Sequence, residues 1–335
     1  MRRRTLFREF VMANAVAGRA PRTRAKKKPA QASGEVRIEQ LREKDLLEAA
    51  LLMYRSANAL RKTVGLELYG PKLTAAPPLL AHIYSQDPDL SWGAYQDDKL
   101  LGFATSHMRD RQWHIAYLFV EPEHQSQGIG KQLLSTGLAE AHKREAHFTS
   151  QCTFIYNAKA IGLYTKMGMF PRKNLMHMEG PAANSVEWPK PNSNLVPELI
   201  SSTAVLNELN FMDREVRGIN RAVDHCYWLA DDDHDGYVFK NQNNTVGYAY
   251  ISQHGCIGPV LAMRDMYLPD ILLNCLHLLA ERGDVVPKIW LNGKNFASLQ
   301  MLLNNGFRIK EIGLLLTNRM FCDVRRYVAS SMAVF

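Results

Sequence analysis

The stretch EHQSQGIGKQLL, residues 123–134, joins two segments of different pattern. Before it, QWHIAYLFV (112–120) is rich in aromatic and branched residues and predicts a strand. After it, apolar residues at helical spacing predict a helix from about 128 to 144. Glycines at a helix start are often turn or packing residues. They also expose unpaired N–H groups at the positive end of a helix dipole, which suits a phosphate.

The surrounding residues predict an alternation of strands and helices on both sides of this loop. The patterns predict helices at 43–65, 77–86 and 157–168, a hairpin over 91–108, and a strand at 148–156. Gly65 and Gly168 follow the last helical residues, as helix-ending glycines do. The first structural unit is therefore expected to end near residue 180.

The second half of the chain repeats segments of the first, and its two helices align with those of the first half at an offset of 138 to 139 residues. Segment 181–197 (PAANSVEWPKPNSNLVP) is rich in proline and asparagine and predicts a domain boundary. Beyond it, VGYAYIS (246–252) is similar to LGFATSH (101–107), and two helical segments, 270–281 and 295–307, are similar to 130–141 and 157–169. A repeat of this length indicates a duplicated domain. At the same offset, Gln125, Gly128 and Gly130 become Arg264, Tyr267 and Pro269, and Tyr164 becomes Leu302, so the second copy lacks the loop.

Composition indicates a globular body attached to a basic tail. Hydrophobic residues make up 46% of the 335 residues, enough for two cores. The five cysteines form no Cys-x-x-Cys pair, which favours a reducing compartment over a disulfide framework or a zinc site. No apolar run approaches the roughly 18 residues of a membrane span. Residues 1–33 hold ten Lys or Arg and one acid, so the remainder, at −1, offers no charge footprint for nucleic acid.

Three interpretations of the tail stay open. It is a solvated extension or an over-long start with initiation at Met12, an organelle presequence, or a polyanion-binding arm built on Lys26, Lys27 and Lys28. The expected location is therefore the cytoplasm, with organelle targeting as the alternative, and nucleic acid is expected to bind at most weakly through the tail.

Taken together, the "LLGFA" strand, "LFVEP", Gln125-x-x-Gly128-x-Gly130 and the "NAKAIGLYTKMGMF" helix resemble the GNAT acyltransferase superfamily over residues 35–180. The second half resembles the degenerate copy of tandem members. The resemblance implies two α/β domains, each a mixed, mostly antiparallel sheet flanked by helices. The expected organisation is a tail (1–34), a catalytic domain (35–180), a linker (181–197) and a degenerate domain (198–335). Residues 195–330 are expected to pack on the first domain and make the chain a monomeric pseudo-dimer.

The resemblance also implies acetyl-CoA as donor, a primary amine of a small molecule or peptide as acceptor, and neither a metal nor a membrane. Tyr164 would protonate the departing thiolate and Asn157 would orient the pantetheine arm. His114 is a candidate base, with Glu121, Glu123 and His124 as alternatives; histone-type members carry a strand glutamate where His114 stands. The remaining donor-binding residues would be Phe119, Val120, Gln125, Ser126, Gln127, Gly128, Ile129, Gly130 and Lys131.

Three other hypotheses compete with catalysis. A non-catalytic acyl-CoA sensor or scaffold would need the loop but neither Tyr164 nor a base. A nucleic-acid or ribosome binder would depend on the tail. DDDHDGYVFKNQ (231–242) has the spacing of the start of a calcium loop, but Gln242 stands where a bidentate glutamate is expected and a strand pattern follows, which favours an acidic turn.

Overall fold

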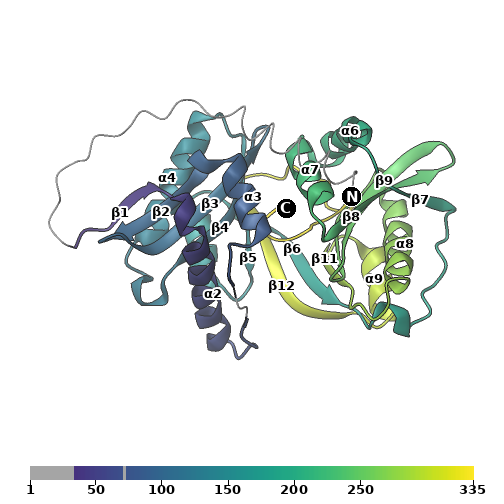
Figure 1. The fold of residues 1–335 in the computed structure, drawn as a ribbon, viewed down its shortest axis with the longest axis horizontal. Helices are drawn as coiled ribbons and strands as arrows, with labels where there is room; N and C mark the ends of the chain where they lie inside the picture. The colour runs from purple at the N-terminus through teal and green to yellow at the C-terminus, as the bar shows by residue number, and fades with distance from the viewer. Residues whose placement is uncertain (1–33, 71–72) are drawn as a thin grey trace. The chain divides into compact units, whose positions relative to one another are not determined.

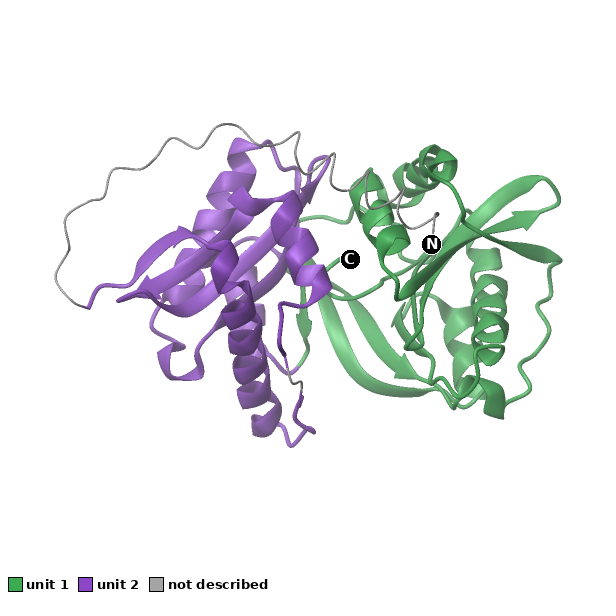
Figure 2. Cartoon of the chain, viewed as in Figure 1, with its two compact units in different colours: residues 1–14, 152–155, 170–335 green, residues 15–151, 156–169 purple. Residues whose placement is uncertain are grey.

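The computed structural model describes residues 34–70 and 73–335, so the predictions for the basic tail lie outside the described residues. The chain divides into two compact units (Figures 1 and 2). Unit 2 comprises the described residues up to 151 together with 156–169, and unit 1 comprises 152–155 and 170–335. Each unit therefore contains residues of the first sequence repeat.

Unit 2 is a sheet with helices on both faces. Its strands lie in the order β1-β2-β3-β4-β5, all antiparallel except the parallel pair β4 and β5. The elements are β1 (Arg37–Gln40), α2 (Leu46–Thr63), α3 (Pro78–Gln86), β2 (Ser91–Gln96), β3 (Lys99–Arg109), β4 (Gln112–Val120), α4 (Ile129–Lys143), β5 (Phe148–Phe154) and α5 (Ala158–Lys166).

Side-chain alternation along the strands of unit 2 assigns the helices to opposite faces of the sheet. Tyr95 and Phe103 pack with buried residues of α2 and α3. Their chain neighbours Ala94 and Ala104 pack with Ile129 and Leu133 of α4. Since successive side chains of a strand point to opposite faces, α4 covers one face while α2 and α3 cover the other.

The strands of unit 1 lie in the order β12-β6-β11-β10-β9-β8-β7, with β13 on β10. Its core includes Ile251, Val260, Leu272 and Leu276, which join α8 to β9 and β10. The elements are β6 (Phe170–Glu179), β7 (Leu195–Leu199), α6 (Leu206–Arg217), α7 (Ala222–Ala230), β8 (His234–Asn241), β9 (Asn244–Ser252), β10 (Cys256–Ala262), α8 (Leu268–Ala280), β11 (Lys288–Asn292), α9 (Phe296–Asn304), β12 (Arg308–Thr317) and β13 (Tyr327–Val328).

Strand β6 comes from the first sequence repeat but lies between β11 and β12 of the second, antiparallel to both. Met178 of β6 is buried in the core of unit 1. The segment 181–197 also contributes to this core through Ala183, Trp188 and Leu195. The residues that bury this segment come from much later in the chain, as Phe307 does for Trp188.

The structure confirms the expected fold class and most of the expected elements. The sheets are mixed and mostly antiparallel, and helices flank them. The strand predicted at 112–120 has those bounds, and Gly128 directly precedes α4. The acidic turn predicted over 231–242 is confined to 231–233, because β8 occupies His234–Asn241, and the strand expected after Gln242 is β9, which begins at Asn244. Among the described residues, no helix has both the length and the apolarity that crossing a bilayer requires.

Candidate active site

Registered pairing between β4 and β5 covers only the first part of β4 and ends before the glycine-rich loop. The first registered pair between β4 and β5 is Gln112 with Phe148, and the last is Ile115 with Gln151. Strand β4 continues beyond this pair to Val120. On its other side β4 stays paired with β3 up to Gly102–Val120, with an irregularity after Thr105. Residues 116–119 are only partly buried. Within the described part of the chain, the last part of β4 therefore has no registered strand partner on the β5 side.

The connection from β4 to α4 has an unusual backbone that explains one of its glycines. Pro122–His124 form a short 3₁₀ turn, and Ser126 has φ of +66°. Gly128 precedes α4 with φ of +91°, a conformation that side chains disfavour. A Cβ added at Gly128 would meet only the Gln132 amide, at 4.0 Å, so Gly128 is required by backbone conformation and not by crowding.

Gly130 is not explained by packing within unit 2. A Cβ placed there would lie 3.7 Å from Val120 Cγ2 and 3.8 Å from Leu163 Cδ2, which are ordinary contacts. The protein itself therefore has room for a side chain at this position. A glycine in the first turn of a helix lowers helix propensity, and close approach of a ligand to the backbone is one reason to have it there.

The N-terminus of α4 presents its first turn without a side-chain cap. The N–H of Gln132 donates to the Gly128 carbonyl at 3.0 Å, which is the first hydrogen bond of the helix. Gly128 offers no capping side chain. The N–H groups of the first turn have no acceptor inside a helix, and together with the helix dipole they favour an anion.

Two glutamines hold the loop in place through its own backbone. Gln125 donates from Nε2 to the Val120 carbonyl and to Ser56 Oγ of α2, each at 3.2 Å. Gln127 donates to the Glu123 carbonyl at 3.1 Å. The side chain of Gln125 thus joins the end of β4 to the loop and to α2, and its expected contribution to donor binding is to fix the backbone.

Positive charge lies on both sides of the loop. Lys131 lines an open depression of about 470 Å³ with Ile38, Gly128, Gln132, Ser135 and Thr136. Lys159 of α5 reaches Ser126 Oγ with its ammonium group at 3.4 Å. A helix N-terminus flanked by two lysines fits a polyphosphate in charge and hydrogen-bond type.

Helix α5 carries the two other residues expected at the site. Asn157 caps this helix, accepting from the Ala160 N–H at 3.2 Å, so its amide has a local structural role. Tyr164 is 2% exposed and belongs to the core. The contact distance between Leu163 and the Gly130 position places this turn of α5 against the start of α4.

His114 lies on the part of β4 that is paired with β5. It is fully buried, and its Nδ1 lies 2.9 Å from Ser150 Oγ of β5. Its ring is 5.3 Å from the ring of His107 on β3. The structure therefore brings His114 onto the same strand as the open segment, but it holds the imidazole inside the sheet.

Glu121, at the carboxyl end of β4, is engaged in an ion pair. Arg55 of α2 donates from Nε to its two carboxylate oxygens at 3.0 and 3.3 Å, and from Nη2 to Glu48 at 2.7 Å. Glu121 is 6% exposed, and its carboxylate raises the pKa of Arg55. This pair connects α2 to the end of β4 and makes Glu121 a positioning residue.

Sequence reasoning missed Tyr117, which lies on the open segment of β4. Burial raises the pKa of its phenol above the usual value, and nearby Tyr54 of α2 adds a smaller effect in the same direction. The hydroxyl is therefore protonated near neutral pH and is available as a hydrogen-bond donor. In the predicted strand, Tyr117 stands three residues before Val120. The strand pattern alone did not distinguish this tyrosine from a packing residue.

The equivalent connection in unit 1 differs in length and chemistry. Residues 263–267 join β10 to α8, a shorter link than 121–128. Pro269 lies in the first turn of α8, and the neighbouring Asp270 accepts from the N–H groups of Asn192 and Ser193 at 3.0 and 2.8 Å. Proline thus stands where unit 2 has Gly130, and a carboxylate stands where unit 2 has Lys131.

Comparisons with known proteins agree with this geometry. Residues 57–169 match the acetyltransferase (GNAT) family, and this range includes β4, the loop, α4 and α5. A search of curated proteins finds no match. A Pyrococcus horikoshii protein assigned as an acetyltransferase has a TM-score of 0.70 at 14% identity, over 93% of this chain and all (100%) of that one.

Two further structures share the fold. A GCN5-related N-acetyltransferase from Sphaerobacter thermophilus has a TM-score of 0.60 at 14% identity, over 86% of this chain and 96% of its own. Another, from Anabaena variabilis, has a TM-score of 0.54 at 12% identity, over 84% and 72%. At these identities the likeness concerns the fold. Residues 57–169 thus match the acetyltransferase (GNAT) family, and the longer chain shares the fold of these structures.

Proposed function

We propose that the chain is an N-acetyltransferase that moves an acetyl group from acetyl-CoA to a primary amine by direct transfer. The observation that carries this proposal is the open edge of β4 directly beside the uncapped start of α4. An extended amide-containing arm pairs with a free strand edge, and a pyrophosphate binds a helix N-terminus. Acetyl-CoA combines both groups in one molecule.

In this proposal the loop 125–131 holds the donor. The N–H groups of Ile129, Gly130 and Lys131 bind the pyrophosphate, and the ammonium groups of Lys131 and Lys159 add charge. The backbone of Phe119 and Val120 binds the amide groups of the pantetheine arm. The fit is supported by the unexplained glycine at 130, where the protein leaves room that its own packing does not use.

Proton movements are assigned to side chains of β4 and α5. Tyr164 donates a proton to the departing sulfur as the bond from the amine nitrogen to the acetyl carbon forms and the carbon–sulfur bond breaks. A protonated phenol near a developing thiolate makes that group easier to displace. Tyr117 is the alternative donor, because it lies on the part of β4 that has no registered partner on the β5 side.

The amine must lose a proton to become a nucleophile. We assign His114 as the base that accepts this proton through a water molecule, because its imidazole lies on the strand that carries the open segment. Glu121 is engaged by Arg55, and the burial of His114 requires a water path to its ring. A His114→Gln variant is therefore expected to lose turnover at neutral pH and to regain part of it at high pH, where the amine deprotonates unaided.

One observation favours a second function, acyl-CoA binding without transfer. Both Tyr164 and His114 are almost completely buried, at 2% and 0% exposure, while the loop is open. A sensor or scaffold would have these features. The two functions differ in turnover, because only the enzyme releases free CoA when an amine is supplied.

The deciding experiment incubates the purified full-length chain with acetyl-CoA and a panel of primary amines, and measures the CoA thiol released. We expect release above the hydrolysis rate with at least one amine, and its loss in Tyr164→Phe. Tight CoA binding with no amine-dependent release across small amines and peptide amines would instead establish the binding function.

A further inference from the structure

The groove that is open in unit 2 has an equivalent in unit 1, between β10 and β11, and there it is filled by the chain. Direct parallel pairing of β10 with β11 covers only Cys256–Ile257 and Lys288–Ile289, although β10 continues to Ala262. Beyond that point Val260 and Leu261 pair with Val328 and Tyr327 of β13. On the other side, Ala329 forms a bridge to Trp290 of β11.

Further hydrogen bonds from backbone and side-chain amide groups hold the same segment along the groove. The N–H of Ala262, the last residue of β10, donates to the Arg326 carbonyl at 2.9 Å. Asn295 donates from Nδ2 to the Arg325 carbonyl at 2.6 Å. Asn295 occupies the position in the second repeat that Asn157 occupies in the first. The asparagine before α9 therefore binds a peptide carbonyl, whereas Asn157 caps α5.

Two glycines of unit 1 provide space for the same segment. A Cβ at Gly258 would lie 2.5 Å from the Ala329 carbonyl oxygen, and a Cβ at Gly313 of β12 would lie 2.9 Å from the Met332 sulfur. A side chain at Gly258 would displace backbone, and the φ of +151° there disfavours one in any case, whereas a side chain at Gly313 would displace only the flexible end of Met332. Gly258 therefore marks the place where the backbone of the segment lies directly against β10.

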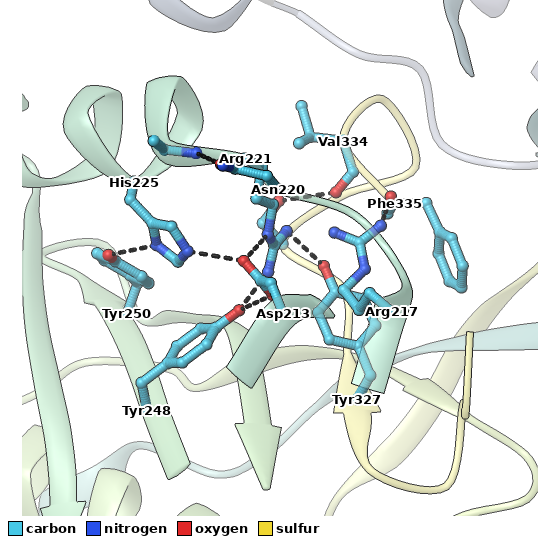
Figure 3. Close-up of polar contacts among 12 residues, drawn as sticks. Asp213, Arg217, Asn220, Arg221, His225, Tyr248, Tyr250, Tyr327, Val334 and Phe335 are labelled. Atoms are coloured by element: carbon cyan, nitrogen blue, oxygen red, sulfur yellow. Dashed lines mark hydrogen bonds and ion pairs between the residues drawn. The ribbon is translucent and has the colours of Figure 1, made fainter. Parts of the chain in front are cut away.

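A buried polar cluster on α6, α7 and β9 holds the aromatic side chains of the segment (Figure 3). Arg217 stacks on the ring of Tyr327, with 4.4 Å to its centroid, and donates to the Phe335 carbonyl. Arg221 donates to the Tyr327 hydroxyl at 2.9 Å. Asp213 fixes Arg221 through a 2.8 Å contact, so the cluster is arranged around the segment.

The remaining groups of the cluster keep Asp213 ionised. His225 Nε2 lies 2.7 Å from Asp213 Oδ2, and the Tyr248 hydroxyl donates to Oδ1 at 2.7 Å. Nδ1 of His225 lies 2.8 Å from the Tyr250 hydroxyl. These groups are fully buried. Arg221, which donates to Tyr327, is thus preorganised by a contact with Asp213 that does not involve the segment.

We propose that residues 325–335 are an internal peptide ligand of the groove between β10 and β11, and that this groove binds the same segment when it is supplied as a separate peptide. The inference does not depend on the transfer reaction proposed above. It assigns to unit 1 a strand-accepting site, with Arg217 and Arg221 as the residues that select its aromatic ligand.

The test removes residues 325–335 and returns them in trans. The shortened chain is titrated by calorimetry with the peptide RRYVASSMAVF. We expect saturable binding of one peptide per chain and a higher unfolding temperature on binding. A peptide carrying Tyr327→Ala is expected to bind at least ~10-fold more weakly, because an aromatic anchor is lost. The proposal would be overturned if the shortened chain folds but binds the two peptides equally, or binds neither of them.

The same titration with CoA separates a peptide site from a second cofactor site. Because Pro269 and Asp270 occupy the start of α8, we expect no CoA site in unit 1 even after the segment is removed. A new CoA site that competes with the peptide would contradict the assignment of a peptide as the ligand.

If the shortened chain does not fold, full-length variants supply the test. Gly258→Ala introduces the 2.5 Å clash with Ala329 at a φ of +151°, and Gly283→Ala, at an open position of unit 1 with φ of +99°, is its matched control for backbone strain alone. We expect hydrogen exchange at Val328 and Ala329 to rise at least ~10-fold only in Gly258→Ala, since local opening controls exchange. Asn295→Ala should show a smaller rise and Asn305→Ala none. Unchanged protection in Gly258→Ala would refute the proposal.

Discussion

Replacing Gly128 with alanine tests whether the turn before α4 is an anion site or only a turn. Gly128 has φ of +91°, and an alanine there would keep a strained backbone or rotate out of it. A left-handed conformation costs an L-residue about 1–2 kcal/mol. The added Cβ meets nothing closer than 4.0 Å, so no clash adds to this cost. We therefore expect the unfolding temperature to fall by about 2–4 °C per kcal/mol.

Gly168 provides a matched control in the same unit. It has φ of +86°, and a Cβ there would meet nothing within 4 Å, but it follows the C-terminal end of α5. Gly168→Ala should therefore lose a similar amount of stability. The two variants differ only in which end of a helix is strained, so they separate a general loss of stability from a local loss of the binding site.

The measurement is CoA affinity by calorimetry, beside thermal unfolding of the same samples. We expect Gly128→Ala to bind CoA at least ~10-fold more weakly, a loss of about 1.4 kcal/mol, because its first-turn N–H groups no longer converge. Gly168→Ala should bind CoA as the wild type does. Equal CoA affinity in all three proteins would refute the reasoning and leave Gly128 as a turn residue.

Three further outcomes are expected. Tyr164→Phe should keep CoA binding and lower turnover by about 10²–10⁴-fold, and if Tyr117→Phe shows that loss instead, the acid is on β4. Calorimetry should give one CoA site per chain, and two equivalent sites would contradict the lost loop at Pro269. Asp213→Asn should cost about 3–5 kcal/mol of unfolding free energy at pH 7, since it leaves Arg221 buried and unpaired. The pKa of Asp213 is lowered in the folded state by Arg221 and His225, against a desolvation that raises it. This stabilisation is present above about pH 4 and fades below it, so urea unfolding of the two proteins should converge in acid.

The local elements of this protein depend on residues that are close together in the chain, so the sequence alone predicts these elements. Side-chain periodicity predicted β4, α4 and α5, because a strand or helix places residues two or four positions apart on one face. Gly128 precedes a helix and Gly168 follows one, and the positive φ of each is a conformation that glycine adopts readily at a helix end. The loop itself could be located for the same reason, since its glycines and the first turn of α4 are adjacent in the chain.

Contacts between distant residues required the tertiary structure. Nothing near Phe170–Glu179 indicates that β6 lies between β11 and β12, because the register of a strand depends on partners elsewhere in the chain. Arg221 and Tyr327 are 106 positions apart, yet the buried cluster depends on their hydrogen bond. Periodicity cannot show which buried charges find partners, and only the folded backbone brings Asp213, Arg221 and the last residues of the chain into one groove. The open edge of β4 is likewise a property of two strands, and the sequence of either strand alone does not contain it.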